Sequence, residues 1–323
     1  MKLYPYDTKN QRLMTDVKGI PVDRAFLAHI QIKAEDAVGA DTDGIHAART
    51  CPAVNVAAAC TVKAGSASTD TLTVTATAAL GEDPNILKIL LTTAANDTLA
   101  VSKNDTTGVI TIALANATAS KNTATLIQTA IRTLTAVSEI SVTAFTCTAG
   151  GNWNSAAIAT GETGAVNFTG GVTAASDILT TGITNPSVPR NITATAGGTT
   201  GDIKAVQVIV EGTNYNGDVI TETLPAFTAD TAGTVTGNKA FKTVTKITIP
   251  PHDGTGATTA IGFGSKLGLP YKLAHNTCLE AFIDNEKEGT APTVATSETA
   301  IESNTITLNT SLSGKVVDAY FIV

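Results

Sequence analysis

The side chains best suited to chemistry in this chain are four histidines and four cysteines, and their spacing argues against a metal or nucleophilic site. The histidines stand singly, so no H-x-H or H-x-x-x-H pair is present to bind a metal. The cysteines form no C-x-x-C pair and have no histidine beside them. We therefore expect buried small hydrophobes and structural or surface histidines. These residues are His29, His46, His252, His275, Cys51, Cys60, Cys147 and Cys278.

Two further patterns resemble ligand-binding loops but fail at a required position. Asn214, Asn216 and Asp218 alternate as calcium ligands do, yet Pro225 stands at position twelve, where a bidentate carboxylate is needed. In GFGSKLG, residues 262–268, a leucine replaces the third glycine of a dinucleotide fingerprint. No G-x-S-x-G elbow is present, and local spacing marks no acid pair. We therefore expect no enzymatic activity, no metal and no cofactor.

The composition predicts a strand-rich protein without a nucleic-acid or membrane partner. Charged residues make up 15% of the chain and aromatic residues 4%, and the net charge is −7 without a Lys/Arg cluster. Small and β-branched side chains favour many short strands, and the absence of a basic patch argues against a polyphosphate backbone. No run approaches the ~20 apolar residues of a membrane span, and the polar N-terminal residues lack the apolar core of a signal peptide, so we expect neither. A protein made in the cytoplasm of its host is therefore expected.

Residues 53–172 are expected to fold as a small α+β domain. Its strands are predicted at 71–80, 86–93, 98–103 and 108–115, where β-branched or alternating segments are bounded by Gly, Asn or Asp. Residues 119–136 instead predict an amphipathic helix with Ser120 as its N-cap. The apolar stripe of this helix consists of Ile127, Ile131, Leu134, Leu126 and Ala130.

The residues on either side of this domain are also predicted to be mainly β. Residues 1–20 are polar and resemble an extended arm. From Val22 the spacing fits either a short helix or a strand, with a slight preference for a strand. The run 239–250 predicts a strand with one wetter face, with Thr243, Thr245 and Ile247 opposite Lys242, Val244 and Lys246. The last strand must lie within a sheet to bury Tyr320, Phe321 and Ile322.

The stretch VQVIVEGTNYNGDVITETL, residues 206–224, predicts a β-hairpin. Two β-rich runs flank a polar turn that contains Asn216-Gly217, the strongest short-range hairpin signal. The stretch contains no evident catalytic group. A structural role for this hairpin is therefore expected, with its turn as a candidate contact.

Four stretches together resemble a family of structural proteins from the head and tail gene clusters of tailed bacteriophages and prophages. They are TTGITNPSVPRNITAT at 180–195, EGTNYNGDVITETL at 211–224, the segment 237–284 that begins GNKAFKTV, and the segment 291–323 that begins APTVATSE. In that family, a segment similar to DTDGIHAA (residues 41–48) is soon followed by one similar to ILTTGITNPSVPRN. Here residues 49–177 intervene, and their inserted part resembles β-rich modules with one helix in phage surface proteins.

The resemblance implies a discontinuous host domain with a domain inserted in one of its loops. The host, residues 21–52 plus 173–323, is expected to be β-sandwich-like, and residues 53–172 form the insertion. The implied function is that of a virion structural protein. We expect a capsid decoration protein that binds the outer head lattice, with the major capsid protein or its own copies as partners.

Two alternatives to capsid decoration remain. A tail-tube or other tail structural protein would use the same β architecture to form rings. A carbohydrate-binding or adhesion module would bind a host-surface glycan. The scarcity of aromatic stacking residues, with Trp153 the only tryptophan, argues against this alternative. Candidate subunit contacts lie in the arm and at the hairpin turn, and they are Tyr4, Tyr6, Leu13, Asn216 and Gly217.

Overall fold

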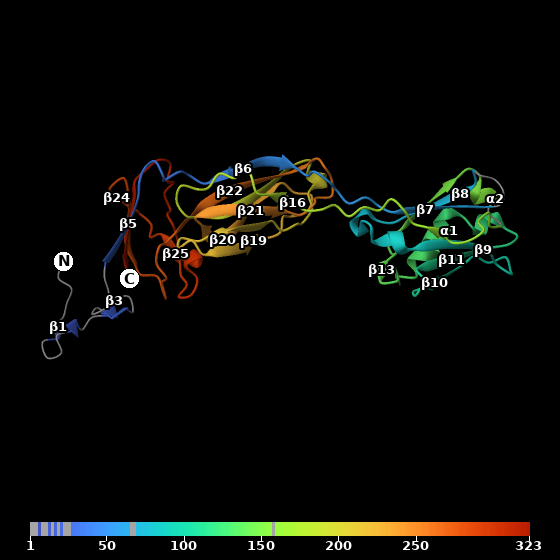
Figure 1. Cartoon of the computed structure of the whole chain (residues 1–323), viewed down its shortest axis with the longest axis horizontal. Helices are drawn as coiled ribbons and strands as arrows, with labels where there is room; N and C mark the ends of the chain where they lie inside the picture. Colours follow the sequence, from blue (N-terminus) through green and yellow to red (C-terminus); the bar gives the residue numbers. More distant parts are fainter. Residues whose placement is uncertain are drawn as a thin grey trace. The chain divides into compact units, whose positions relative to one another are not determined.

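The fold is mainly β and separates into two compact units. In the computed structural model, residues 27–64, 69–154 and 159–323 are described in full, residues 155–156 only by their backbone, and residues 1–26 only by the backbone pairing of four two-residue strands. Unit 1 comprises Met1–Pro52 and Ser176–Val323, and unit 2 comprises Ala53–Ala175 (Figure 1). Within the described residues, no helix is long and apolar enough to cross a membrane.

Unit 2 consists of two main sheets around one apolar core. One sheet has the order β10-β11-β9-β15, in which β9 and β11 are parallel, and the other has the order β14-β8-β7. A two-residue pair, β12 and β13, lies apart from them. The strands are β7 (Ala59–Lys63), β8 (Thr71–Thr75), β9 (Lys88–Thr93), β10 (Ala100–Asn104), β11 (Val109–Leu114), β12 (Ala136–Val137), β13 (Ile140–Ser141), β14 (Thr146–Gly150) and β15 (Val166–Asn167).

The predicted helix of unit 2 exists but is shorter than the sequence pattern suggested. Helix α1 spans Ala124–Arg132, and its N-cap is Thr123, whose Oγ1 accepts from Leu126 N at 3.4 Å. Ser120 lies in a preceding 3-10 turn, Ala119–Lys121, so its predicted capping role is wrong. The cause is Asn122, whose buried side chain pairs with the backbone of Ala115 and holds this segment outside the helix.

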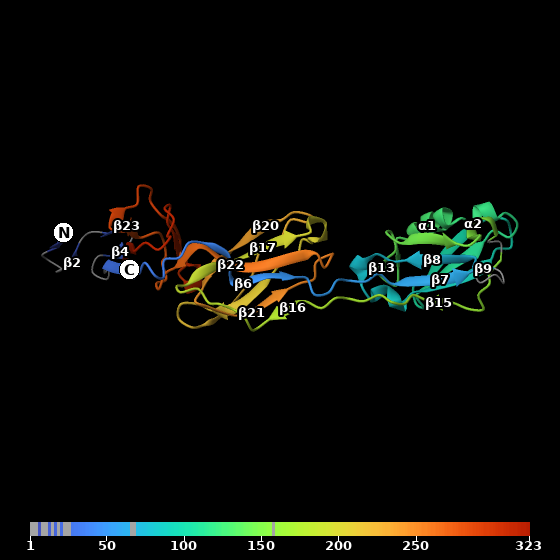
Figure 2. The same cartoon turned by 90° about the horizontal axis from the view of Figure 1, so that it is seen from above.

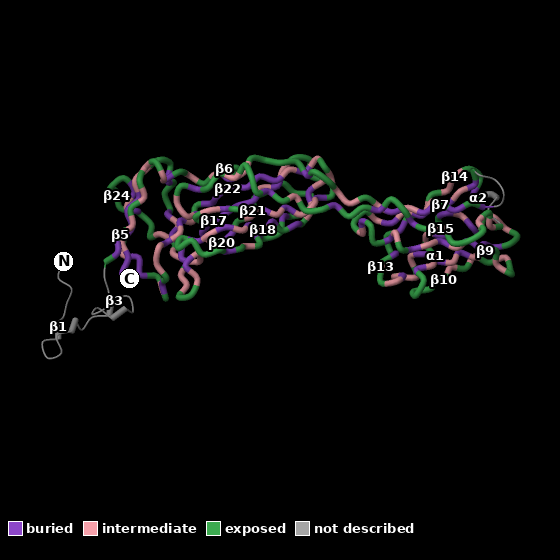
Figure 3. Tube along the Cα trace, in the orientation of Figure 1, coloured by how far each residue is buried: buried purple, intermediate pink, exposed green. Residues whose placement is uncertain are grey.

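The core of unit 2 collects side chains from both sheets and the helix. Ile127 and Ile131 of α1 are fully buried, whereas Leu126 is 47% exposed and does not belong to the apolar stripe. Phe145 and Phe168 contact each other with ring centroids 5.6 Å apart. Trp153, in the four-residue helix α2 (Trp153–Ala156), is also fully buried. Unit 2 therefore has a closed apolar core of its own (Figure 3).

Unit 1 contains two sheets that share one core. The first has the order β16-β21-β18-β19, and the second runs β20-β17-β22-β26-β25 with β6 paired to β22. Figure 2 shows β20, β17, β22 and β6 side by side. Buried residues of both sheets form one cluster, including Ile192, Val210, Ile247 and Ile261. The strands are β6 (Asp41–Thr50), β16 (Asp177–Leu179), β17 (Arg190–Gly198), β18 (Ile209–Thr213), β19 (Val219–Thr223), β20 (Gly233–Phe241), β21 (Thr243–Ile249), β22 (Ala257–Gly268), β25 (Thr293–Ala295) and β26 (Thr305–Thr307).

A third sheet of unit 1 has the order β24-β23-β27-β5 and a second core. Its strands are β5 (Leu27–Ile32), β23 (Cys278–Ile283), β24 (Glu286–Lys287) and β27 (Val317–Ile322). The strand preferred for the segment after Val22 is confirmed by β5. The last strand, β27, lies within a sheet as predicted, between β23 and β5. Phe321 and Ile322 are buried there, whereas Tyr320 is only half-buried.

The run 239–250 departs from the predicted single strand. It forms the end of β20 and all of β21, which are separated at Lys242. Val244 and Ile247 are both buried although they are three residues apart. The reason is a β-bulge, because Gly212 pairs with Val244 whereas the preceding Glu211 pairs with Lys246. The predicted two faces, Thr243, Thr245 and Ile247 against Lys242, Val244 and Lys246, are therefore wrong.

Candidate functional site

Three of the four histidines contact polar neighbours in the structure, and Cys51 Sγ accepts from His252 N at 3.4 Å. No group of three His, Cys, Asp or Glu in the described ranges could hold a metal. His29 Nε2 lies 2.6 Å from Asp318 Oδ1 in the third sheet, whereas His46 Nδ1 contacts the carbonyl of Ala47. His252 is buried and accepts at Nδ1 from Lys204 N, and its Nε2 contacts Thr259 Oγ1. Burial lowers the pKa of His252. These contacts are structural.

The predicted hairpin is present, and its loop is organised by Asn214. Strands β18 and β19 pair antiparallel, from Ile209 opposite Thr223 to Thr213 opposite Val219. Asn214 is 3% exposed, and its Oδ1 accepts from the backbone N–H groups of Asn216 and Asp218, each at 3.0 Å. Of the Asn-Gly pair, Gly217 alone has a positive φ, +89°. The loop is therefore an Asn-capped turn with glycine in a left-handed position.

A distant acid fixes the base of this loop. Asn214 Nδ2 donates to Asp218 Oδ2 at 3.2 Å and to Glu302 Oε2 at 3.3 Å. Glu302 belongs to a 3-10 turn, Ile301–Ser303, and its Oε1 lies 4.0 Å from Lys239 Nζ. The hairpin is thus tied at its base to a segment 88 residues away in the sequence. Such a loop is preorganised, which lowers the entropy lost when a partner binds it.

The tip of the hairpin, residues 215–219, is exposed throughout. Val219 is 82% exposed, the highest value among the large hydrophobic residues described, and Tyr215 is 40% exposed. Lys242 Nζ lies 5.9 Å from the centroid of the Tyr215 ring. Asn216 and Gly217, two predicted contact residues, occupy the centre of this tip. An apolar and an aromatic side chain on a fixed turn are suited to a protein contact.

The other predicted contact residues lie in the N-terminal segment. Tyr4 lies outside the described residues. The backbones of Tyr6 in β1 (Tyr6–Asp7) and Leu13 in β2 (Arg12–Leu13) pair antiparallel. A second pair is formed by β3 (Asp16–Val17) and β4 (Ile20–Pro21). The structure therefore does not bring the arm residues and the hairpin turn into one described site.

Trp153 is not available as a glycan platform. Its side chain is fully buried in the core of unit 2, and its Nε1 donates to the Asn122 carbonyl at 2.9 Å. A stacking platform must present a ring face to solvent. Trp153 therefore cannot be the stacking residue of the carbohydrate-binding alternative.

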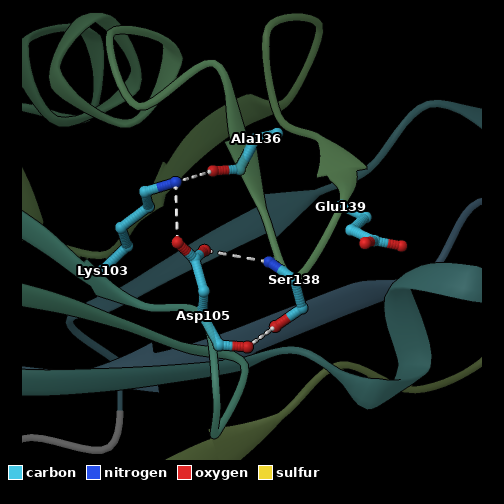
Figure 4. A pocket seen from close by; sticks show the side chains of 5 residues that line it. All are labelled: Lys103, Asp105, Ala136, Ser138 and Glu139. Atoms are coloured by element: carbon cyan, nitrogen blue, oxygen red, sulfur yellow. Dashed lines mark hydrogen bonds and ion pairs between the residues drawn. The ribbon is translucent and has the colours of Figure 1, made fainter.

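A surface pocket of about 440 Å³ in unit 2 is lined by polar side chains that bind one another (Figure 4). Lys103 Nζ donates to the Ala136 carbonyl at 2.8 Å and lies 3.0 Å from Asp105 Oδ2. Asp105 Oδ1 accepts from Ser138 N at 3.0 Å. The Ser138 N–H and Lys103 hold the pKa of Asp105 below its usual range. The charges of Lys103 and Asp105 thus neutralise each other, and Glu139 adds a further acid to the lining.

Ser138 and Glu139, which border this pocket, form the turn between β12 and β13. Both have positive φ values, +48° and +70°, as a two-residue type I′ turn requires. Neither is the glycine or asparagine that such a turn usually contains. The Ser138 hydroxyl donates to the Asp105 carbonyl at 2.6 Å, which helps to hold this backbone in place.

Comparison with known proteins found no relative of this chain. No protein-family model matches the chain, and no similar protein was found among curated proteins or solved structures. The structure is that of a mainly β protein of two units, with an exposed hairpin tip anchored at its base.

Sequence reasoning found the hairpin turn but missed the residues that organise it. Asn214 carried a usable signal, because an asparagine directly after a strand often caps its own turn. Glu302 carried none, since its contact with Asn214 spans 88 residues. Arg190, a fully buried cation, was likewise not singled out.

Proposed function

We propose that this chain is a structural protein of a tailed-bacteriophage virion and that it decorates the capsid. Unit 1 would bind the outer head lattice, either the major capsid protein or copies of itself, and unit 2 would be an insertion carried by that host unit. The sequence resemblance lies mainly in unit 1, which supports the assignment of the binding role to that unit. Unit 1 would be the β-sandwich-like host, because two of its sheets share one core.

The observation that carries the proposal is the way the chain enters and leaves unit 2. Val56 and Val172 form an antiparallel bridge with both backbone hydrogen bonds, at 2.9 and 3.1 Å. Asn55 Oδ1 also accepts from Ala174 N at 2.8 Å. An insertion is tolerated where its two ends lie close together in a surface loop. The paired ends of unit 2 and a core made of its own residues alone support the proposed insertion.

The hairpin tip supplies a second line of support. A lattice protein needs rigid exposed contacts more than a pocket, and residues 215–219 combine exposed Tyr215 and Val219 with an anchored base. Replacement of Val219 by Asp would place a charge in that contact and should weaken capsid binding. Replacement of Ile86 by Asp is the control, because Ile86 lies in unit 2 and is 62% exposed, and it should leave binding unchanged.

The decisive experiment is the copy number of the chain in separated heads and tails of the phage that encodes it. Quantitative mass spectrometry should find hundreds of copies in the head fraction, in a simple ratio to the major capsid protein. Enrichment in tails would replace decoration by the tail-tube hypothesis. Absence from both fractions would refute a virion role.

A second experiment tests the roles of the two units. Residues 57–171 are deleted, and Val56 is joined to Val172 by a Gly-Gly linker, which suits the short separation of a bridged pair. The shortened protein should fold and bind capsids as the full chain does. A folded unit 1 that no longer binds would move the binding surface to unit 2.

A further inference from the structure

Arg190 is a buried cation without a carboxylate partner. It begins β17, is 1% exposed, and forms no ion pair with any described residue. Its guanidinium lies 5.0 Å from the centroid of the Phe263 ring. Buried charges in proteins are normally paired, because an isolated charge is costly to remove from water. Burial lowers the pKa of Arg190 to about 10.

The hydrogen bonds of Arg190 leave part of its guanidinium unused. Nε and Nη2 both donate to the carbonyl of Gly264, and Nη1 donates to the carbonyl of Val38 at 2.8 Å. A guanidinium has five N–H groups, so one on each terminal nitrogen lacks an acceptor in the described part of the chain. Carboxylates often accept from two N–H groups of one arginine at once.

A pocket of about 320 Å³ lies against this residue. Its lining combines Arg190 with two buried leucines, Leu308 and Leu312, and with the exposed polar residues Ser265 and Thr310. Gly39, next to the Val38 carbonyl that accepts from Arg190, completes one wall. The volume is at the lower end of the range for small-molecule sites.

The pocket wall formed by residues 308–312 is fixed by hydrogen bonds to Glu288. Glu288 is 8% exposed, and its two carboxylate oxygens accept from the backbone N–H groups of Asn309 and Thr310 at 3.1 and 3.2 Å. This acid is therefore engaged with the loop, and its hydrogen bonds fix the loop backbone. The pocket is built by packed and hydrogen-bonded elements, as a preorganised site requires.

We propose that this pocket binds a single carboxylate group, with the carboxylate on Arg190 and a short apolar chain against Leu308 and Leu312. One cation matches one negative charge, which favours a monocarboxylate over a phosphate dianion. The carboxylate belongs either to a small organic acid or to the end of a polypeptide chain. The proposal is independent of the virion role.

The first test is a titration of the full chain with sodium butyrate at constant ionic strength. The readout is the side-chain Nε–H signal of Arg190 in a ¹⁵N NMR spectrum, one of only five arginines in the chain. The signal should shift saturably with a Kd of about 1 mM, typical of a small ligand with one charged contact. Equal shifts with sodium chloride or sodium phosphate, or no saturable shift, would overturn the proposal.

A variant that fills the pocket tests its position without removing the buried charge. Gly39 has open space for a side chain and no positive φ, so Gly39→Leu should fold and occupy the pocket. It should weaken butyrate binding at least tenfold. Gly289→Leu is the matched control, because Gly289 also has open space and lies outside the pocket lining. Unchanged binding in Gly39→Leu would show that butyrate binds elsewhere.

Two peptides distinguish the source of the carboxylate. Acetyl-Ala-Leu with a free carboxyl terminus is compared with the same peptide as an amide. Tighter binding of the free acid than of butyrate supports a chain terminus as the natural ligand. Weaker binding than butyrate supports a small acid, and equal binding of acid and amide contradicts a carboxylate site.

Discussion

The two units bury different kinds of side chain. In unit 2 the core is almost entirely apolar, and the buried polar residues among those described there are Asp70 and Asn122. Unit 1 buries many more polar groups, among them Arg190, His252 and Asn304. Unit 2 is therefore stabilised mainly by the burial of apolar area, whereas unit 1 depends on hydrogen bonds that hold long loops against its sheets. A core substitution should weaken unit 2 most, and loss of a polar anchor should weaken unit 1 most.

The largest effect is expected from a cavity in the core of unit 2. Phe145 is fully buried and packs against Phe168, so Phe145→Ala should cost about 3–5 kcal/mol. Trp153, the only tryptophan, reports on unit 2 alone, and its fluorescence transition should move to lower denaturant concentration.

The matched control is Phe241→Ala, which removes an equally buried phenylalanine from unit 1. It should leave the Trp153 transition in place, because the two cores share no residue. A similar shift in both variants would mean that the units unfold together.

The second effect concerns a polar anchor in unit 1. Asn304 is fully buried, and its Oδ1 accepts from Leu273 N and Ser297 N at 3.0 and 2.9 Å. Its Nδ2 donates to the carbonyls of Ser297 and Ala300 at 2.9 and 2.8 Å. Asn304→Ala leaves these backbone groups buried and unpaired, which should cost about 3 kcal/mol or more.

The comparison residue in unit 2 is Asn122, which is equally buried but bonds Ala115 N and O with its side chain. Asn122→Ala should cost about 2 kcal/mol, because fewer backbone groups lose a partner. Hydrogen exchange of unit 1 and Trp153 fluorescence of unit 2 measure the two costs separately. A larger loss in Asn122→Ala would reverse the contrast between the units.

Acid should weaken unit 1 at a higher pH than unit 2. Burial lowers the pKa of His252 below its ordinary value of 6.5. Below pH 6.5 this histidine is therefore protonated more readily in the unfolded chain than in the folded unit. Stability is therefore fully present above pH 6.5 and is lost as the pH falls toward the folded-state pKa. Hydrogen exchange of unit 1 at pH 7 and pH 5 should show this loss, and His252→Asn should remove it.

Unit 2 should keep its stability to a lower pH than unit 1. Lys121 and Thr118 lower the pKa of Asp97 well below its ordinary value of 3.8, and Ser138 and Lys103 lower that of Asp105. For a lowered carboxyl pKa, stability is present above the unfolded value and is lost below about pH 4. A Trp153 transition that weakens already between pH 7 and pH 5 would contradict this order.

The sequence predicted secondary structure well where the residues that determine it lie close together in the chain. Alternating residues located β9 and β11, the apolar stripe located α1, and Asn216-Gly217 located the hairpin. The failures have physical causes beyond local pattern. Asn122 shortened α1 by bonding Ala115, and a β-bulge between Val244 and Lys246 changed the faces of β21.

The candidate sites show the same limit. The tip residues Asn216 and Gly217 could be predicted, because turn chemistry is encoded within a few residues. The anchor Glu302 and the pocket around Arg190 could not, because each joins segments that are distant in the sequence. Only the pairing of strands brings those segments together.

The smallest loss of stability is expected from a substitution in the hairpin tip. Gly217 has a φ of +89° with open space around it, so Gly217→Ala meets no clash and is penalised only by the left-handed backbone. The expected cost is about 1 kcal/mol, seen as faster hydrogen exchange of β18 and β19. Gly289→Ala, also in open space but without a positive φ, should be nearly neutral. Equal effects of the two substitutions would mean that Asn214 and Glu302 hold the turn without help from Gly217.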